Sequence, residues 1–195
     1  MTHHKFDIRK LERLNDPGRF ESLPPDVFFS ALELPEGSSV IVEIGAGTGL
    51  FAEEFTVRAP GATVYVTDIA EEALEWIRAN RSGVAGGRIV PVMAEETCVP
   101  LPDEFADAVY MINIHHELVD PAATYADAFR LLKPGGRLLV VDWAVRETPK
   151  GPPAISRVTA ETLTGIVCGA GFSDVKVDED RLVWHIMATA TRPRE

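Results

Sequence analysis

Glycine is concentrated in one short stretch of the sequence, VEIGAGTGLF at residues 42–51, which directly follows an apolar run. Because glycine has no Cβ, alternating glycines let a turn adopt positive φ and let a ligand approach the main chain closely. Gly45, Gly47 and Gly49 therefore predict a loop that binds a cofactor. The dinucleotide-binding fingerprint G-x-G-x-x-G needs a third glycine where this chain has Leu50, so the spacing disfavours NAD. A cofactor without a pyrophosphate fits the loop better.

Acidic residues stand on both sides of this loop. Asp68 follows it by roughly 20 residues, at the end of a predicted strand, where a carboxylate can accept hydrogen bonds from both hydroxyls of a ribose. The same residue is also suited to be the N-cap of the next helix, and the two roles are compatible. Glu43 directly precedes the loop and would lie beside a positively charged ammonium or sulfonium group of the cofactor, neither of which NAD carries.

A second group with chemical potential is the run His115-His116-Glu117. We do not expect a metal site, because neighbours on an extended chain point to opposite sides and three in a row rarely converge on one ion. An imidazole near neutral pH can accept a proton from a nucleophile, whereas a purely structural role suits either histidine as well. If the reaction uses a base, His116 and Glu117 are the candidate catalytic residues. Trp143 is expected in the core rather than in a pocket wall.

Length and composition limit the class of protein. The 195 residues suffice for one well-buried core, and 46% hydrophobic with 25% charged residues is typical of a globular chain. No apolar stretch approaches the roughly 18 to 20 residues that span a bilayer, and the N-terminus lacks the apolar centre of a secretory signal, so a cytoplasmic protein is expected. The net charge of −11 disfavours a nucleic-acid partner and favours a small molecule. Cys98 and Cys168 form no metal or redox motif and are expected to be small core or loop residues.

The elements that must position these residues follow from the alternation of apolar runs with helical patterns. Five strands are predicted at 39–44, 63–67, 88–93, 107–113 and 137–143, and a terminal hairpin at 174–177 and 182–190. The fold class is therefore α/β, a Rossmann-like doubly wound seven-stranded sheet that is mostly parallel with an antiparallel C-terminal edge hairpin. In such sheets ligands bind beyond the carboxyl ends of the strands, where the glycine loop lies.

Capping residues mark several helix ends. Asp120 with Pro121 predicts a helix start, and Thr159 predicts another, whose helix closes at Gly171. Residues 131–136, LLKPGG, are expected to end the earlier of these helices. The loop at 94–105 shows little helical pattern, and the proline-rich connection at 146–157 is expected to cross the surface.

Taken together, in this order and spacing, the motifs resemble those of class I S-adenosylmethionine-dependent methyltransferases, of the group similar to quinone-biosynthesis C-methyltransferases (methyltransferase type 11). The resemblance covers nearly the whole chain. The matching stretches are VEIGAGTG, YVTDIAEEAL, AEETCVPLPDEFADAVYMINIHHEL and LLKPGGRLLVVDW.

The resemblance implies a role for each matching position. Asp68 would hold the ribose of S-adenosylmethionine, Ile69 would flank the adenine, and the backbone of Asn113 would pass under the sulfonium. Glu95 stands where the family usually has an aspartate. The bed of the methionine moiety would be Gly45, Ala46, Gly47 and Gly49, and the adenine amino group would meet Ala94, Glu95 and Glu96.

The function expected from this resemblance is transfer of a methyl group from S-adenosylmethionine to a small-molecule acceptor by in-line displacement. C-, O- and N-methylation stay open, whereas trivalent arsenic is disfavoured because the chain has only two cysteines. Two alternatives are a non-catalytic protein that binds adenosyl ligands and, less favoured, an NAD-dependent oxidoreductase. We expect a single domain over 1–195, with residues 1–36 as a helical lid. The acceptor site would combine this lid, the loop after the fourth strand and residues 150–157.

Overall fold

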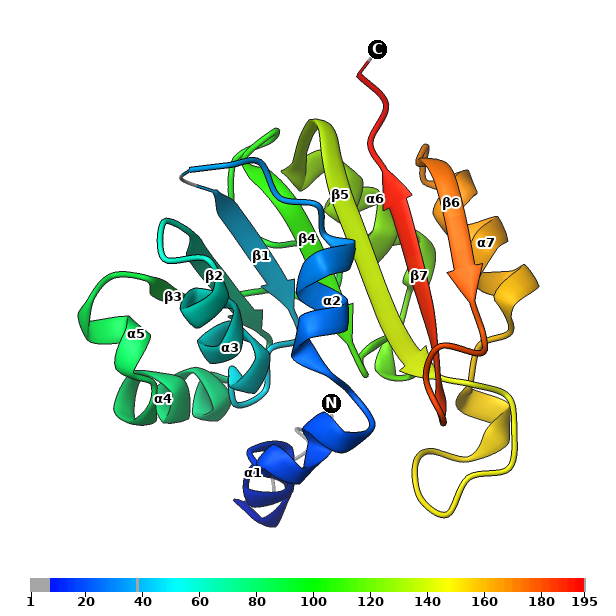
Figure 1. Ribbon diagram of the computed structural model, residues 1–195, viewed down its shortest axis with the longest axis horizontal. Coiled ribbons are helices and arrows are strands. Elements are labelled where there is room, and N and C mark those ends of the chain that lie inside the picture. Colours follow the sequence, from blue (N-terminus) through cyan, green and yellow to red (C-terminus); the bar gives the residue numbers. More distant parts are fainter. Residues whose placement is uncertain (1–7, 38, 195) are drawn as a thin grey trace.

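A seven-stranded sheet forms the centre of the computed structural model, which describes residues 8–37 and 39–194. The strand order is β3-β2-β1-β4-β5-β7-β6 (Figure 1). The strands are β1 Val40–Ile44, β2 Thr63–Asp68, β3 Ile89–Met93, β4 Ala106–Ile112, β5 Leu132–Trp143, β6 Ser173–Asp178 and β7 His185–Thr191. The first five pair in parallel, and β7 lies antiparallel between β5 and β6. The predicted fold class is confirmed.

Helices cover both faces of the sheet. The α-helices are α1 Ile8–Leu14, α2 Pro25–Ala31, α3 Leu50–Arg58, α4 Glu71–Asn80, α5 Ser82–Ala85, α6 Pro121–Leu131 and α7 Ala160–Gly169. Three short 3₁₀ helices are η1 Pro17–Glu21, η2 His115–Glu117 and η3 Ala154–Ser156. In the described residues, no helix combines the length and the apolar character needed to cross a membrane.

Two hydrophobic cores result, one on each face. On one face Phe28 of α2, Phe55 of α3 and Ile77 of α4 pack together with strand residues. On the other face Tyr125 of α6 and Val167 of α7 pack against the alternate residues of the same strands. Because both faces are covered, the inner strands must be apolar along their whole length, and this explains the near-continuous apolar runs of the sequence.

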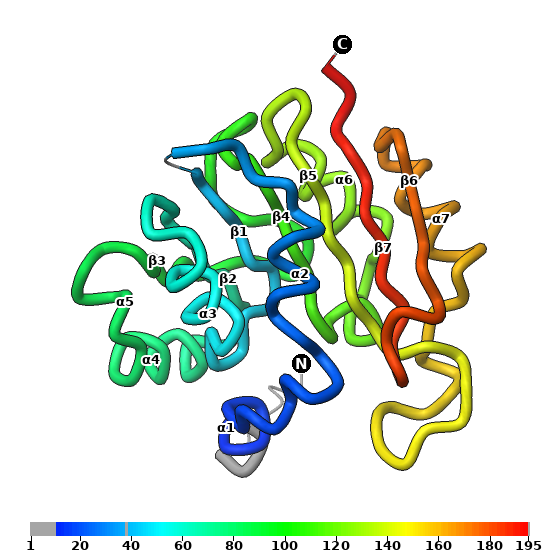
Figure 2. The backbone as a smooth tube through the Cα atoms, in the orientation of Figure 1, coloured from blue at the N-terminus to red at the C-terminus, as the bar shows by residue number. Residues whose placement is uncertain are grey.

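The strand order reverses between β1 and β4. From β1 the chain builds outward through β2 and β3, and it then returns to place β4 on the other side of β1. Such a switch point leaves a crevice at the carboxyl ends of the two central strands. The N-terminal segment with α1 and the connection after β5 lie at this same end of the molecule (Figures 1 and 2).

The predicted caps are confirmed. The Asp120 side chain accepts the Ala123 N–H at 3.0 Å, and Pro121 is the first residue of α6. The Thr159 hydroxyl accepts the Thr162 N–H at 3.1 Å. Gly171 follows α7 with φ of +101°. The proline-rich connection at 146–157 is largely exposed, as predicted.

Several predicted details are wrong. Strand β5 begins at Leu132 rather than at residue 137, because Leu132 already pairs with Ala106 before a register shift. Strand β7 begins at His185 rather than at residue 182. Cys168 lies exposed on α7, so it is neither a core nor a loop residue, whereas Cys98 is an exposed loop residue.

Two local predictions about the site elements are also corrected. His115–Glu117 is not extended: it forms the 3₁₀ helix η2, which rotates successive side chains by about a third of a turn instead of alternating them. Asp68 is not the N-cap of α4, because that position is Ala70, whose side chain cannot cap. Asp68 instead ends β2 and binds backbone groups of the glycine loop.

Candidate functional site

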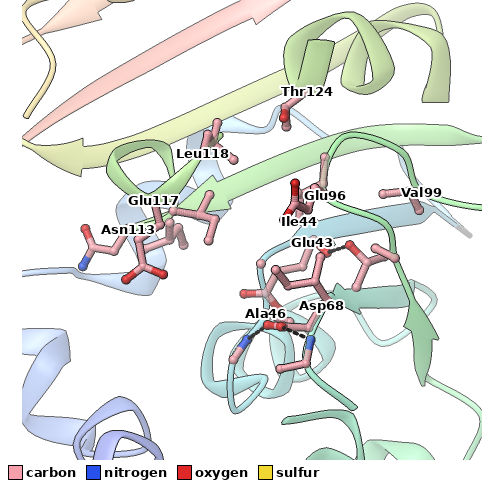
Figure 3. A pocket seen from close by; sticks show the side chains of 18 of the residues that line it. Glu43, Ile44, Ala46, Asp68, Glu96, Val99, Asn113, Glu117, Leu118 and Thr124 are labelled. Carbon is pink, nitrogen blue, oxygen red and sulfur yellow. Dashed lines mark hydrogen bonds between the residues drawn. The ribbon is translucent and has the colours of Figure 1, made fainter. Parts of the chain in front are cut away.

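A cavity of about 770 Å³ opens at the carboxyl ends of β1, β2 and β4 (Figure 3). This volume lies in the range of small-molecule sites. Of the residues predicted to bind a cofactor, the cavity is lined by Glu43, Gly45, Ala46, Gly47, Asp68, Ile69, Ala94, Glu95, Glu96 and Asn113. Gly49 is not part of this lining and is instead the N-cap of α3. The cavity therefore joins residues from the ends of four strands, β1 to β4, that are distant in sequence.

The glycine loop forms the floor of the cavity. The N–H groups of Gly45 and Ala46 both donate to the Thr67 carbonyl at 2.9 Å, so the loop is fixed to the end of β2. Gly45 has φ of +73°, and a Cβ at this position would lie 2.5 Å from Cγ1 of Ile114. Gly47 has φ of +55°. Glycine is thus required here both by backbone conformation and by space.

Asp68 holds the loop from the neighbouring strand. Its Oδ2 accepts the Gly47 N–H at 2.8 Å and its Oδ1 accepts the Ala70 N–H at 3.0 Å. An ionised carboxylate offers about four lone-pair positions, so one carboxylate can accept hydrogen bonds from several donors at once. Its carbonyl also accepts the Ala94 N–H at 3.0 Å, which ties the end of β2 to the segment after β3.

Glu43 places a buried carboxyl group against the cavity. The residue is 3% exposed, and its Oε2 has no hydrogen-bond partner among the described residues. Burial raises the pKa of Glu43 to about 8, an effect that nearby Tyr110, Arg19 and Arg81 partly offset. At neutral pH the group is therefore largely protonated, and a cation in the cavity would favour its ionised form.

The upper wall of the cavity combines apolar and acidic groups. Ile69 is 56% exposed at the rim, which gives a flat ring an apolar surface to lie on. Glu95 and Glu96 are exposed beside it. Asp127, which was not predicted from the sequence, also lines the cavity. Its carboxylate accepts the Val99 N–H at 2.8 Å and thereby fixes the loop after β3.

Asn113 follows β4 on the opposite side of the cavity from Asp68 (Figure 3). Its φ is +59°, a value in the left-handed region that asparagine tolerates better than most residues. Its N–H donates to the Val141 carbonyl at 2.8 Å, and its side-chain oxygen is buried without a partner in the described chain. Conformations of this kind cluster at ligand sites.

The N-terminal segment closes another side of the cavity. Leu14 and Arg19 both line it. The Arg19 guanidinium donates to the Leu14 carbonyl at 2.6 Å and lies 5.2 Å from the centre of the Phe51 ring. Burial lowers the pKa of Arg19, and Glu43 counteracts this. No local signal in the sequence marked Arg19, because only tertiary packing brings it to the cavity.

Arg81 links this segment to the glycine loop. Its guanidinium donates to the Thr48 carbonyl at 2.7 Å and also to the Asn15 side-chain oxygen. The N-terminal segment is thereby held against the loop by a side chain from the end of α4. Movement of the segment would have to break these contacts.

The two histidines of η2 point to different partners. His115 is buried, its Nδ1 lies 2.9 Å from the Tyr125 hydroxyl, and burial lowers its pKa. Nδ1 of His116 lies 2.9 Å from Oδ1 of Asp142. Glu117 lines the cavity, whereas His116 lies outside the lining. Sequence reasoning missed Asp142, although one acidic residue at the end of the apolar run LLVVDW was a usable signal.

Trp143, which the sequence predicted to lie in the core, is 9% exposed and does not line the cavity. Its ring packs on His185 with ring centres 4.3 Å apart. This agrees with the packing role that the sequence favoured. In the described residues, no group of three or more His, Cys, Asp or Glu side chains is arranged to hold a metal ion.

Comparison with known families gives one match, to a methyltransferase domain, over residues 42–140. This region runs from β1 into β5 and contains the glycine loop, Asp68 and η2. It makes up about half of the chain.

Curated relatives carry related names. The chain is 32% identical over 115 residues to ubiquinone/menaquinone biosynthesis C-methyltransferase UbiE of Bordetella avium, covering 57% of this chain and 44% of that protein. It is 27% identical over 153 residues to demethylmenaquinone methyltransferase of Clavibacter sepedonicus, covering 77% and 61%. The chain thus spans about half the length of the curated relatives it matches.

Among solved structures, a SAM-dependent methyltransferase from Aquifex aeolicus superposes with a TM-score of 0.85 at 26% identity. The match covers 96% of this chain and 100% of that one, so the similarity extends over both sides of the cavity.

Proposed function

The chain belongs to the methyltransferase domain family, and from this premise we propose that it is an S-adenosylmethionine-dependent methyltransferase that acts on a small-molecule acceptor. One observation carries the proposal. The buried carboxyl of Glu43, whose Oε2 has no hydrogen-bond partner among the described residues, and the loop-holding carboxylate of Asp68 face one cavity from adjacent strand ends, with the glycine loop between them.

The charge of the cavity supports this cofactor over NAD. Arg19 is the one Lys or Arg in the described lining. The lining also contains seven carboxyl side chains, those of Glu43, Asp68, Glu72, Glu95, Glu96, Glu117 and Asp127. A pyrophosphate would be repelled here, whereas a ligand that carries an ammonium and a sulfonium group would be attracted.

The residues present fit each part of the proposed cofactor. The Asp68 carboxylate is suited to accept hydrogen bonds from ribose hydroxyls, and exposed Ile69 offers an apolar surface to the adenine ring. Glu43 would face the positive charge of the methionine moiety. The backbone bed would be Gly45, Ala46 and Gly47, the adenine amino group would meet Ala94, Glu95 and Glu96, and the backbone of Asn113 would lie under the sulfonium. Gly49 would act through the start of α3 rather than by contact.

When bound, this cofactor supplies an electrophilic methyl group. The main tasks of the chain are therefore to align the acceptor with that methyl group and to exclude water. We propose that residues 1–195 form one such domain and that residues 1–36 act as its lid. Within the described part of the lid, Leu14 and Arg19 already wall the cavity. Residues 1–7 lie outside the described residues. Arg19 is suited to pair with the cofactor carboxylate.

The acceptor is proposed to enter on the η2 side. The names of the curated relatives point to C-methylation in quinone biosynthesis. Acceptor screening should therefore start with hydroxylated rings related to quinones. Simple phenols and amines follow as the next classes.

Isothermal titration calorimetry with S-adenosylmethionine, S-adenosylhomocysteine and NAD tests the cofactor. Both adenosyl ligands should bind and NAD should not. Asp68→Ala should weaken adenosyl binding by about 100-fold, because charge-assisted hydrogen bonds are each worth about 1.5–3 kcal/mol. Asp180→Ala, an exposed aspartate in the β6–β7 turn, is the matched control and should change nothing.

The possible outcomes distinguish the candidate functions. Binding of NAD alone would contradict the proposal. Binding of both adenosyl ligands with no homocysteine product released across a broad acceptor panel would instead favour a non-catalytic binding protein. Circular dichroism of Asp68→Ala distinguishes a lost ligand contact from a collapsed loop.

A further inference from the structure

Three side chains lie in a row from the cavity wall into the protein. Glu117 lines the cavity and its side chain is 47% exposed. His116 comes next, with Nε2 lying 3.7 Å from Oε1 of Glu117 and the side chain 11% exposed. Asp142 is last, fully buried, with Oδ1 lying 2.9 Å from Nδ1 of His116. The three come from η2 and from the end of β5.

The hydrogen bonds of Asp142 determine the tautomer of His116. Oδ1 of Asp142 also accepts the Trp143 N–H at 2.7 Å, so this oxygen acts as an acceptor. Nδ1 of His116 must therefore carry the proton of their shared hydrogen bond. Nε2 is then left with a lone pair on the side that faces Glu117. This is the arrangement in which an imidazole can take up a proton.

The surroundings favour a transient positive charge on His116 more than on its neighbours. His116 has a carboxylate on each side, from Glu117 on η2 and Asp142 on β5. The other groups that face it are His115 on η2 and His185 on β7, and burial lowers the pKa of both. Neither neighbour therefore competes as a cation near neutral pH.

We propose that Glu117, His116 and Asp142 form a proton relay, and that the methyl acceptor is accordingly a nucleophile that carries a proton, such as a ring hydroxyl or an acidic ring carbon. This rests on the proposed methyltransferase function. It excludes acceptors without a proton to lose, such as thioethers and tertiary amines. Glu117 is the group that meets the acceptor, His116 receives the proton from it, and Asp142 is a positioning residue.

The step balances without an added reagent. A new bond forms between the acceptor atom and the methyl carbon, and the methyl–sulfur bond breaks with its electron pair going to sulfur. The acceptor proton passes to the Glu117 carboxylate and on to Nε2 of His116. The resulting imidazolium is held between two carboxylates and releases its proton to solvent through its exposed edge.

Long-range ¹H–¹⁵N NMR of the histidine rings in the full chain tests the relay without any acceptor. In the parent, neutral His116 should carry its proton on Nδ1. In Asp142→Asn the preference for this tautomer should weaken, because an amide oxygen is a poorer acceptor than a carboxylate. Glu75→Gln, an exposed glutamate of α4, is the control and should leave the preference unchanged.

A proton on Nε2 in the parent, or a tautomer preference that is the same in Asp142→Asn as in the parent, would overturn the relay. If Asp142→Asn does not fold, the tautomer of the parent decides alone. Calorimetry keeps the two proposals apart, since Glu117→Gln should still bind S-adenosylhomocysteine. If the parent chain itself did not bind S-adenosylhomocysteine, the proposed function would be contradicted, and not the relay alone.

A paired acceptor panel tests the substrate class. Catechol is compared with its dimethyl ether, and with trimethylamine and dimethyl sulfide, by release of S-adenosylhomocysteine. Turnover should be confined to proton-bearing members and should fall by roughly 100-fold in Glu117→Gln. Methylation of dimethyl sulfide at equal rates in parent and variant would overturn the inference. If no member is methylated, the tautomer of His116 in the parent and in Asp142→Asn decides.

Discussion

The two sides of the cavity are built in different ways. On the cofactor side, Glu43, the glycine loop and Asp68 belong to one continuous strand–helix–strand segment. On the acceptor side, His116, Asp142 and His185 come from η2, β5 and β7, and they meet only when the sheet is complete. The first side is thus encoded locally, whereas the second is a product of tertiary structure.

The two sides also bury opposite kinds of unpartnered group. Glu43 on the cofactor side is a buried acid whose raised pKa makes it ready to meet a cation. His185 on the acceptor side is 1% exposed, and neither ring nitrogen has a hydrogen-bond partner among the described residues. A cationic ligand would therefore favour the ionised form of Glu43 on one side, whereas burial keeps His185 neutral on the other. Four changes, taken from the largest expected effect to the smallest, test this contrast.

Gly45→Ala should have the largest effect, on the cofactor side. The left-handed backbone costs about 1–2 kcal/mol, and the contact with Ile114 adds about 1–3 kcal/mol to the loss in unfolding free energy. Gly37→Ala is the matched control, since its φ is +96° but nothing lies within 4 Å of the added Cβ. Urea unfolding measures both changes. Equal losses in the two variants would mean that the Ile114 contact does not matter.

Gly151→Ala extends this test to the acceptor side. Its φ is +116°, and the added Cβ would lie 2.8 Å from the Trp143 ring. Stability should fall to a similar degree as in Gly45→Ala. Calorimetry should show that only Gly45→Ala also weakens S-adenosylmethionine binding.

Acid should destabilise the acceptor side. Burial lowers the pKa of His185 to about 4, and Arg19, His116 and Lys150 act in the same direction while Asp142 opposes them. At His185 the unfolded chain binds more protons than the folded chain between pH 6.5 and pH 4, so the contribution of this residue to stability, on the order of 3 kcal/mol, is lost as pH falls through this window.

His185→Phe tests this assignment because it keeps an aromatic ring on Trp143 and removes the titration. Urea unfolding from pH 4 to pH 8 should show that the difference in unfolding free energy between the parent and His185→Phe changes by about 3 kcal/mol between pH 6.5 and pH 4. A slope identical to that of the parent would place the acid sensitivity elsewhere.

Cofactor affinity should also rise with pH, through Glu43 and at higher pH. Glu43 holds a proton in the ligand-free chain up to about pH 8, and a cationic ligand requires its ionised form. Binding therefore releases a proton, and the affinity for S-adenosylmethionine should rise by about tenfold between pH 6 and pH 8. Calorimetry in two buffers of different ionisation enthalpy counts the protons released.

Glu43→Gln should make that affinity nearly independent of pH in the same range. S-adenosylhomocysteine, which lacks the sulfonium charge, should show a shallower dependence than S-adenosylmethionine in the parent. A steep dependence that survives in Glu43→Gln would point to another group. The raised pKa of Glu43 also implies that the ligand-free chain loses stability as pH rises toward 8.

This contrast explains how far the sequence could be read. The number of strands, their alternation with helices and the residues at the ends of β1 and β2 follow from apolar periodicity and from glycine spacing, and both are local signals. The start of β5 was predicted too late because pairing with Ala106 overrides the breaker residues of LLKPGG. Local propensity is the weaker term wherever a strand partner is available.

The acceptor side was predicted less completely for the same reason. Residues His116 and Glu117 were marked by type, but the partner of His116 was not, because residue 142 reaches it only through the pairing of β4 with β5. Arg19 is a similar case, since its place at the cavity depends on how η1 packs on α3. Side-chain type suggested chemistry, and the fold decided which groups meet.

The position of β7 has a consequence for the nascent chain. Strand β5 is bordered by β4 and β7, yet about 40 residues separate the end of β5 from the start of β7. At about 5–20 residues per second, the ribosome leaves one edge of the apolar β5 unpaired for roughly 2 to 8 seconds. An open edge of this kind is a template for intermolecular pairing. The interval before β7 emerges is therefore when the chain is most exposed to aggregation and has most need of a chaperone.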